Sequence, residues 1–251
     1  MELAADRDGA GPPIVLVHGF TQTGRCWGPE ATALATDHEV IRVDAPGHGR
    51  SHGVAADLVA GAGMIADVGG AATYVGYSMG ARFCLHVALH HPERVRGLVL
   101  VGCTAGIEDD DERAERHAQD LRTAQRIAAD GLPVFLDAWI AQPLFSGLPA
   151  DRQFRAERLT NTVDGLRGSL EHAGTGAQSP VWDALPGLAM PVLVVAGARD
   201  DKFAALAERM AAAIGMNAEL ALVPDAGHAA HLEQPDAFLS ILRAWLGRHQ
   251  L

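Results

Sequence analysis

A serine set between two glycines, in the segment Gly-Tyr-Ser-Met-Gly at 76–80, is the residue of this sequence best suited to do chemistry. The segment follows the apolar run 72–75 and leads into a helical pattern over 79–90. A strand, a sharp turn and a helix in this order hold the hydroxyl of Ser78 clear of the sheet, and the flanking glycines let strand and helix approach closely. The same spacing also arises by chance, so the rest of the chain must supply a base, an acid and an anion hole.

A serine hydroxyl becomes a base or a nucleophile when a histidine takes its proton, and a carboxylate must hold that histidine in the right tautomer. Loops that follow two apolar runs offer these partners. Asp200 comes shortly after the run 191–197, and His228 comes shortly after the run 218–223. We therefore predict that Ser78, His228 and Asp200 form a catalytic triad.

Each partner of Ser78 has a rival nearby. Asp201 could serve as the acid, in which case Asp200 would only cap the helix that begins near Phe203. His231 is close to His228 in the chain and could serve as the base. We favour His228 because it follows a glycine directly after a strand, and we favour Asp200 for its position in the loop.

An anion hole needs two backbone N–H groups directed at developing negative charge. Met79 offers one, since it follows the serine at the start of a helix. Phe20, in the turn His18-Gly19-Phe20, is predicted to offer the other. The alternative is that this segment is a tight turn and nothing more.

The composition limits the classes of function. With 251 residues, the chain is long enough for one large α/β domain, with or without an inserted subdomain. Its formal net charge of −11 argues against a nucleic-acid partner, which would need a basic face. No apolar run approaches the ~20 residues of a membrane span, and the acidic N-terminus is unlike a signal peptide. We expect a cytoplasmic protein, monomeric or homodimeric.

The cysteines carry no sign of a redox or metal site. Cys26, Cys84 and Cys103 are an odd number and lack the C-x-x-C spacing of such sites. We predict buried free thiols, with neither a disulfide nor a metal ion. No cofactor is expected.

Short apolar, β-branched runs alternate with helical patterns over residues 1–105 and again over 181–251. This alternation predicts an α/β fold with right-handed crossovers and a mostly parallel, doubly wound sheet. The predicted strands are 13–17, 39–43, 72–75, 97–101, 191–197 and 218–223. A helix over 235–248 is expected to close the chain.

The stretch 106–180 has no strand pattern. Its helices are predicted from about residue 108, over 132–141, over 151–160 and over 163–172. We predict a lid above the C-terminal edge of the sheet, where ligands of open α/β sheets bind. The alternative is a solvated helical insertion without a role in binding.

Taken together, the motifs resemble those of the α/β-hydrolase superfamily over the whole chain. They are HGF at 18–20, D-x-P-G-H-G-x-S at 44–51, GYSMG at 76–80, GARDDKF at 197–203 and AGHxxHLE at 226–233. The order serine, aspartate, histidine along the chain is also that of the superfamily.

Within the superfamily, the chain is similar to the 2-succinyl-6-hydroxy-2,4-cyclohexadiene-1-carboxylate synthases of the menaquinone pathway. This similarity rests on GYSMGAR and on lid motifs, which vary most across the superfamily. The lid motifs are RAER at 113–116, the segment 139–145, ERLTN at 157–161 and the segment 175–178. Ala81 departs from that family, which usually has glycine there, and a helix tolerates either residue.

The resemblance implies a lyase that eliminates pyruvate from 2-succinyl-5-enolpyruvyl-6-hydroxy-3-cyclohexene-1-carboxylate, with the triad as the base. Such a polycarboxylate substrate requires cations in the pocket. Arg82 lies one helical turn after Ser78 on the same face, where its guanidinium would clamp a carboxylate bidentately. Arg158 is a second candidate, with Tyr77 and Trp139 as walls of the pocket.

Several roles stay open from the sequence. Arg82 and Arg158 could instead form surface salt bridges. An arginine of the first lid helix is also implied, and both Arg116 and Arg122 are candidates. The competing functions are a cofactor-free carboxylic ester hydrolase with Ser78 as nucleophile, and a non-catalytic ligand receptor, which fits a complete triad poorly.

Overall fold

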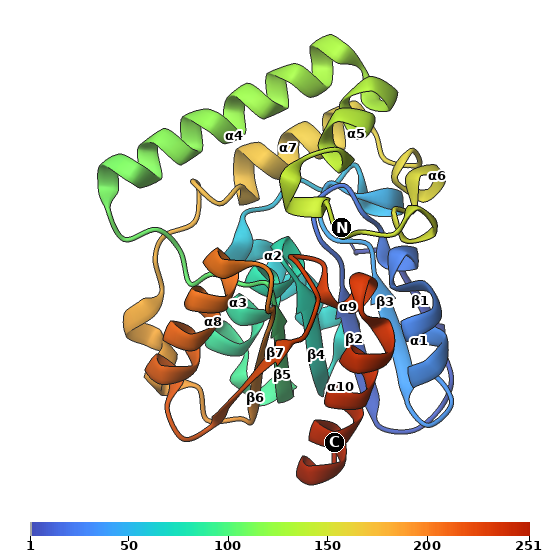
Figure 1. The fold of residues 1–251 in the computed structure, drawn as a ribbon, viewed down its shortest axis with the longest axis vertical. Helices are drawn as coiled ribbons and strands as arrows, with labels where there is room; N and C mark the ends of the chain where they lie inside the picture. The colour runs from blue at the N-terminus through green and yellow to red at the C-terminus, as the bar shows by residue number, and fades with distance from the viewer. Residues whose placement is uncertain (1) are drawn as a thin grey trace.

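The computed structural model describes residues 2–251, in which seven strands form one sheet with helices on both faces (Figure 1). The strands are β1 (Ala5–Asp8), β2 (Pro13–Val17), β3 (Glu39–Val43), β4 (Ala72–Tyr77), β5 (Val95–Val101), β6 (Val192–Gly197) and β7 (Ala218–Val223). Their order in the sheet is β1-β3-β2-β4-β5-β6-β7. Neighbouring strands are parallel except β1 and β3, so the predicted α/β fold with a mostly parallel sheet is confirmed.

The helices pack on the two faces of the sheet. The α-helices are α1 (Gly28–Leu34), α2 (Leu58–Gly69), α3 (Met79–His90), α4 (Asp110–Asp130), α5 (Leu132–Ile140), α6 (Arg155–Arg158), α7 (Val163–Ala173), α8 (Asp201–Ile214), α9 (Ala230–Glu233) and α10 (Pro235–His249). Helices α2, α3 and α8 bury apolar side chains on one face, and α1 and α10 do so on the other. Strands β4 and β6 are therefore buried at every residue, which is why they read as continuous apolar runs.

Strand β1 was not predicted. Its residues, Ala-Asp-Arg-Asp, are mostly charged, and it pairs antiparallel with β3 at the edge of the sheet. Backbone pairing with β3 holds it there, and two surface ion pairs link the same strands, with Arg7 Nη1 2.9 Å from Glu39 Oε1 and Arg42 Nη2 2.5 Å from Asp8 Oδ2. An edge strand supported by backbone pairing needs no apolar run, so hydrophobic patterning does not reveal it.

Helices α4, α5, α6 and α7 lie together at one end of the sheet (Figure 1). No strand occurs in this segment, as the sequence predicted. Helices α4, α5 and α7 share a small apolar core distinct from the two cores against the sheet. The predicted helix over 151–160 is wrong in extent: only a 3₁₀ turn (Ala150–Arg152) and α6 form, because Phe154 adopts a left-handed conformation with φ 51° between them.

The three cysteines are buried free thiols, as predicted. Across residues 2–251, none of the helices has the length and apolar character needed to cross a bilayer.

Candidate active site

Ser78 lies at the turn between β4 and α3 with φ 51° and ψ −107°, a backbone conformation that residues other than glycine rarely adopt. The neighbouring residues must be glycines, because a side chain at either position would collide with nearby backbone atoms. A Cβ added to Gly76 would lie 2.4 Å from Gly80 O, and one added to Gly80 would lie 2.1 Å from Val17 O. The motif therefore marks a real close approach of helix and strand, which lifts the serine above the sheet.

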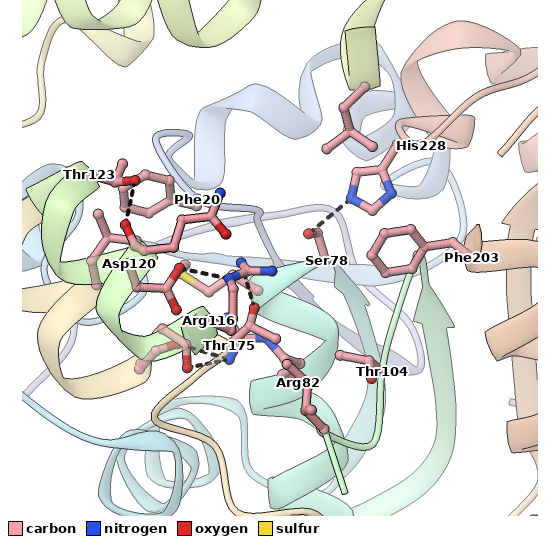
Figure 2. Close-up of a pocket in the computed structure, with 18 of the residues that line it drawn as sticks. Phe20, Ser78, Arg82, Thr104, Arg116, Asp120, Thr123, Thr175, Phe203 and His228 are labelled. Carbon is pink, nitrogen blue, oxygen red and sulfur yellow. Dashed lines mark hydrogen bonds and ion pairs between the residues drawn. The ribbon is translucent and has the colours of Figure 1, made fainter. Parts of the chain in front are cut away.

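The structure brings Ser78, His228 and Asp200 into one hydrogen-bonded series at the C-terminal edge of the sheet. His228 Nε2 is 3.1 Å from Ser78 Oγ, and the two side chains face one another in Figure 2. His228 Nδ1 is 3.1 Å from Asp200 Oδ2. This is the geometry in which an imidazole can take the serine proton while a carboxylate steadies the ring.

Asp200 makes both of the contacts that the sequence left as alternatives, the helix cap and the bond to His228. Its Oδ1 accepts a hydrogen bond from Phe203 N (3.2 Å) and caps α8, while its Oδ2 holds His228. Burial acts to raise the pKa of the carboxyl, but the hydrogen bonds from His228 and from Phe203 N outweigh it and keep the pKa below its usual value. Asp200 is therefore ionised at neutral pH.

The two rivals lie elsewhere. Asp201 is the first residue of α8 and its side chain is exposed. His231 is buried, with its ring centroid 4.6 Å from that of Trp27 and 4.4 Å from that of Tyr77. Burial, with nearby His228 adding to it, lowers the pKa of His231 to about 3, so it stays neutral and acts as packing.

Glu233 was not singled out from the sequence as a separate group, although it ends the AGHxxHLE motif. Its carboxylate accepts hydrogen bonds from Gly227 N (2.7 Å) and Ala229 N (3.0 Å), the residues on either side of His228. The side chain is buried, from the short helix α9. Glu233 therefore fixes the backbone that carries the histidine.

Phe20 N–H is oriented by its own peptide group. Gly19 O accepts from Gln22 N (3.1 Å) and lies 2.8 Å from His18 Nδ1. Because Ala45 N donates to His18 Nε2 (3.0 Å), the ring proton must be on Nδ1, and burial keeps this histidine neutral with a pKa of about 4. In a trans peptide the carbonyl and the N–H point in opposite directions, so fixing Gly19 O also fixes Phe20 N–H.

Two N–H groups are thus available near the serine. Phe20 N–H has no hydrogen-bond acceptor among residues 2–251. Met79 is the first residue of α3, where an N–H has no partner within the helix. Both residues line the same cavity as Ser78.

This cavity, of about 790 Å³, lies between the sheet edge and helices α4, α5 and α7. Tyr77 and Trp139, which the sequence suggested as walls of a substrate pocket, both line it. The Trp139 ring packs edge-on against Phe20, with centroids 5.2 Å apart. In the part of the chain described, no group of three or more histidine, cysteine or acidic side chains is arranged to hold a metal ion.

Arg82 lines the cavity and is buried. Its Nη1 donates to Ala173 O (2.8 Å) and Gly174 O (3.3 Å). No carboxylate of residues 2–251 forms an ion pair with it, so the predicted alternative of a surface salt bridge does not hold. Burial lowers the pKa of the guanidinium to about 10, which leaves it charged at neutral pH.

The structure distinguishes the two arginines of α4. Arg116 lines the cavity, where its Nε is 2.9 Å from Asp120 Oδ1 and its Nη2 donates to Thr175 Oγ1 at 3.0 Å (Figure 2). Arg122 is exposed and does not line the cavity. No sequence pattern indicated Asp120, whose Oδ2 also accepts a hydrogen bond from Gly176 N (2.9 Å).

Arg158 also lines the cavity, but most of its donors are engaged by the protein itself. Its Nε donates to Gln153 O (2.7 Å), and its Nη1 contacts Phe20 O (3.4 Å) and Thr21 Oγ1. Within residues 2–251, its Nη2 makes no hydrogen bond, and this is the group through which it could meet a ligand.

The profile of the alpha/beta hydrolase family matches residues 14–241, and the chain belongs to that family. It is an enzyme of the α/β-hydrolase fold. A Salmonella paratyphi C (strain RKS4594) protein named 2-succinyl-6-hydroxy-2,4-cyclohexadiene-1-carboxylate synthase is 32% identical over 252 residues, which cover 92% of this chain and 94% of that protein.

Solved structures give the same picture. MenH from S. aureus superposes with a TM-score of 0.90 and 27% identity, over 98% of this chain and 99% of that one. A thermophilic esterase from Thermogutta terrifontis, solved with malate bound, superposes with a TM-score of 0.84 and 26% identity, over 99% of this chain and 94% of that one.

Proposed function

We propose that this enzyme eliminates pyruvate from 2-succinyl-5-enolpyruvyl-6-hydroxy-3-cyclohexene-1-carboxylate, and so forms 2-succinyl-6-hydroxy-2,4-cyclohexadiene-1-carboxylate in menaquinone biosynthesis. The relatives named for that product support the assignment. The observation that carries it is the Arg82 guanidinium, buried in the same cavity as Ser78 and without a carboxylate partner among the residues described.

A buried charge without a counter-ion is costly, and an anionic ligand relieves that cost. A site for apolar esters would gain nothing from a cation one helical turn from its serine. The proposed substrate carries three carboxylates, and its recognition accounts for Arg82. Arg116, fixed by Asp120, and the Nη2 of Arg158 supply further positive groups along the same cavity.

In the proposed reaction the triad acts as a base. Ser78 Oγ removes the proton α to the succinyl carbonyl while its own proton passes to His228, which Asp200 steadies. The electron pair of the broken C–H bond forms an enolate. The enolate oxygen accepts hydrogen bonds from the N–H groups of Phe20 and Met79. The carbonyl then re-forms, electrons move through the ring double bond, and the C–O bond to enolpyruvate breaks. The enolpyruvate leaving group takes up the proton that His228 received and becomes pyruvate, so the triad is restored and neither water nor an oxidant is consumed.

We further propose that residues 106–180 are a lid. Its helices supply one side of the cavity, and the Ala173 and Gly174 carbonyls that it contributes hold Arg82. The core domain would then be 1–105 with 181–251.

Pyruvate release tests the function. The substrate is incubated with the protein, and pyruvate is followed by NADH oxidation with lactate dehydrogenase. We expect rapid release by the unchanged protein, loss of about a thousandfold or more in Ser78→Ala, and no loss in Ser240→Ala, an exposed serine of α10 that serves as the control. The absence of pyruvate with the unchanged protein would reject the proposal.

A carboxylic ester hydrolase is the second candidate, favoured by the likeness to the Thermogutta terrifontis esterase. In that case Ser78 would be the nucleophile and an acyl-enzyme would form. A burst and fast turnover with p-nitrophenyl acetate, together with no pyruvate from the cyclohexene substrate, would select the esterase.

A further inference from the structure

Thr21, the residue after Phe20, has a backbone conformation that its side chain disfavours. Its φ is 68°, in the left-handed region, and the residue is fully buried. A β-branched side chain is a genuine outlier there. Such a conformation persists only when the surrounding structure holds it in place, and it is often found where function needs a fixed geometry.

Each polar group of Thr21 is bonded to a segment distant in the sequence. Its N–H donates to His48 Nε2 (3.2 Å), and its carbonyl accepts from Asn161 Nδ2 (2.7 Å). Its hydroxyl oxygen accepts a hydrogen bond from Arg158 Nη1, which also donates to Phe20 O. The restraints therefore come from the loop after β3 and from the segment at the end of α6.

Asn161 joins these segments through one amide. Besides Thr21 O, its Nδ2 donates to Arg158 O (2.9 Å), and its Oδ1 accepts from Gly49 N (2.8 Å). The side chain is 5% exposed and does not line the cavity. Only an amide of this length offers donors to two carbonyls and an acceptor to an N–H at once, so aspartate could keep the bond to Gly49 but not those to the carbonyls.

We propose that Asn161 is a positioning residue that sets the anion hole. By holding Thr21 O, it keeps the turn 19–21 in the conformation that directs Phe20 N–H into the cavity. The anion hole would then depend on the lid segment as well as on the sheet, although Asn161 touches no substrate. This inference rests on the role proposed above for Phe20 N–H.

Two probes separate an effect on the anion hole from a general loss of structure. Benzeneboronic acid accepts a lone pair of Ser78 Oγ as the hydroxyl proton passes to His228, and the resulting tetrahedral boronate places an oxygen in the hole. Succinate is a dicarboxylate that requires only the cationic part of the cavity. The dissociation constants of both probes are measured by calorimetry on Asn161→Ala and Asn161→Asp.

Removing an anion-hole donor costs about 100- to 1,000-fold in rate, and freeing the turn should cost less than deleting the N–H. We expect boronate binding to weaken about tenfold or more in both variants, with succinate binding changed by less than about threefold. Asn217→Ala removes a comparable amide bond, to Leu188 O (2.8 Å), far from the site and should change neither constant.

Unchanged boronate binding in a folded Asn161 variant would overturn the inference. So would equal weakening of both probes, which would indicate a merely structural residue. Both probes act without the cyclohexene substrate. A protein that releases no pyruvate, yet loses boronate affinity selectively in Asn161→Ala, would reject the lyase and keep the role of Asn161.

Discussion

Replacing Arg82 with alanine removes a buried cation that no carboxylate among residues 2–251 neutralises. The variant also frees two carbonyls, Ala173 O and Gly174 O, from their hydrogen bonds with Nη1. These losses oppose the relief of a buried charge, so we expect only a modest change in melting temperature. The effect on anion binding has no such compensation.

The magnitude follows from the burial of the guanidinium. Removing one partner of a buried, hydrogen-bonded charge pair costs about 2–5 kcal/mol. Since a factor of ten corresponds to about 1.4 kcal/mol, the dissociation constant for a carboxylate ligand should rise between about 30-fold and 4,000-fold. Arg82→Lys keeps the charge but loses the planar fork, so its loss should be intermediate.

Calorimetry with succinate measures the binding, and the lactate dehydrogenase assay measures kcat/KM for pyruvate release. Arg122→Ala is the matched control, because Arg122 lies in the exposed face of α4 and does not line the cavity. If a folded Arg82→Ala variant bound succinate as the unchanged protein does, the carboxylate clamp would be wrong.

The same residue predicts a pH dependence. Burial lowers the pKa of Arg82 to about 10, so the guanidinium loses its proton as pH rises through that value. Succinate binding to the unchanged protein should therefore weaken near pH 10. The residual binding of Arg82→Ala should lack this step in the same titration.

Two further predictions concern the histidine loop and the response to acid. Glu233→Gln leaves one of the N–H groups beside His228 without an acceptor. Leaving a buried N–H group without an acceptor costs about 1–3 kcal/mol. We therefore expect kcat to fall about tenfold, with the affinity for succinate unchanged. Equal kcat values in Glu233→Gln and in the exposed control Glu208→Gln would contradict this. Burial lowers the pKa of four histidines, to about 4 for His18 and His86 and to about 3 for His48 and His231. At pH 5 each of these histidines stays neutral in the folded chain but takes up a proton when the chain unfolds. Stability is therefore lost as pH falls through about 6.5, by about 2 kcal/mol for each histidine at pH 5 relative to neutral pH and by about 8 kcal/mol for the four together. Urea unfolding at pH 7.5 and pH 5 measures this, and equal free energies of unfolding would refute it.

The sequence by itself determined the fold class, because strands buried on both faces must be apolar throughout. Such strands can therefore be recognised as continuous apolar runs in the sequence. It also placed Ser78, Asp200 and His228 at the ends of strands, and parallel strands bring their carboxyl ends to one edge. The position of Asp200 in its loop favoured it over Asp201 as the partner of the histidine. In the structure, Asp200 is the one of the two that bonds His228.

Only the tertiary structure decided which side chains meet across long separations. Arg116 and Arg122 look alike in the sequence, and the packing of α4 against α7 turns one into the cavity and leaves the other in solvent. The bond between Thr21 and Asn161 spans 140 residues and has no local pattern. Apolar periodicity records burial, whereas the partner of a polar group depends on how distant segments pack, and that information exists only once the chain has folded.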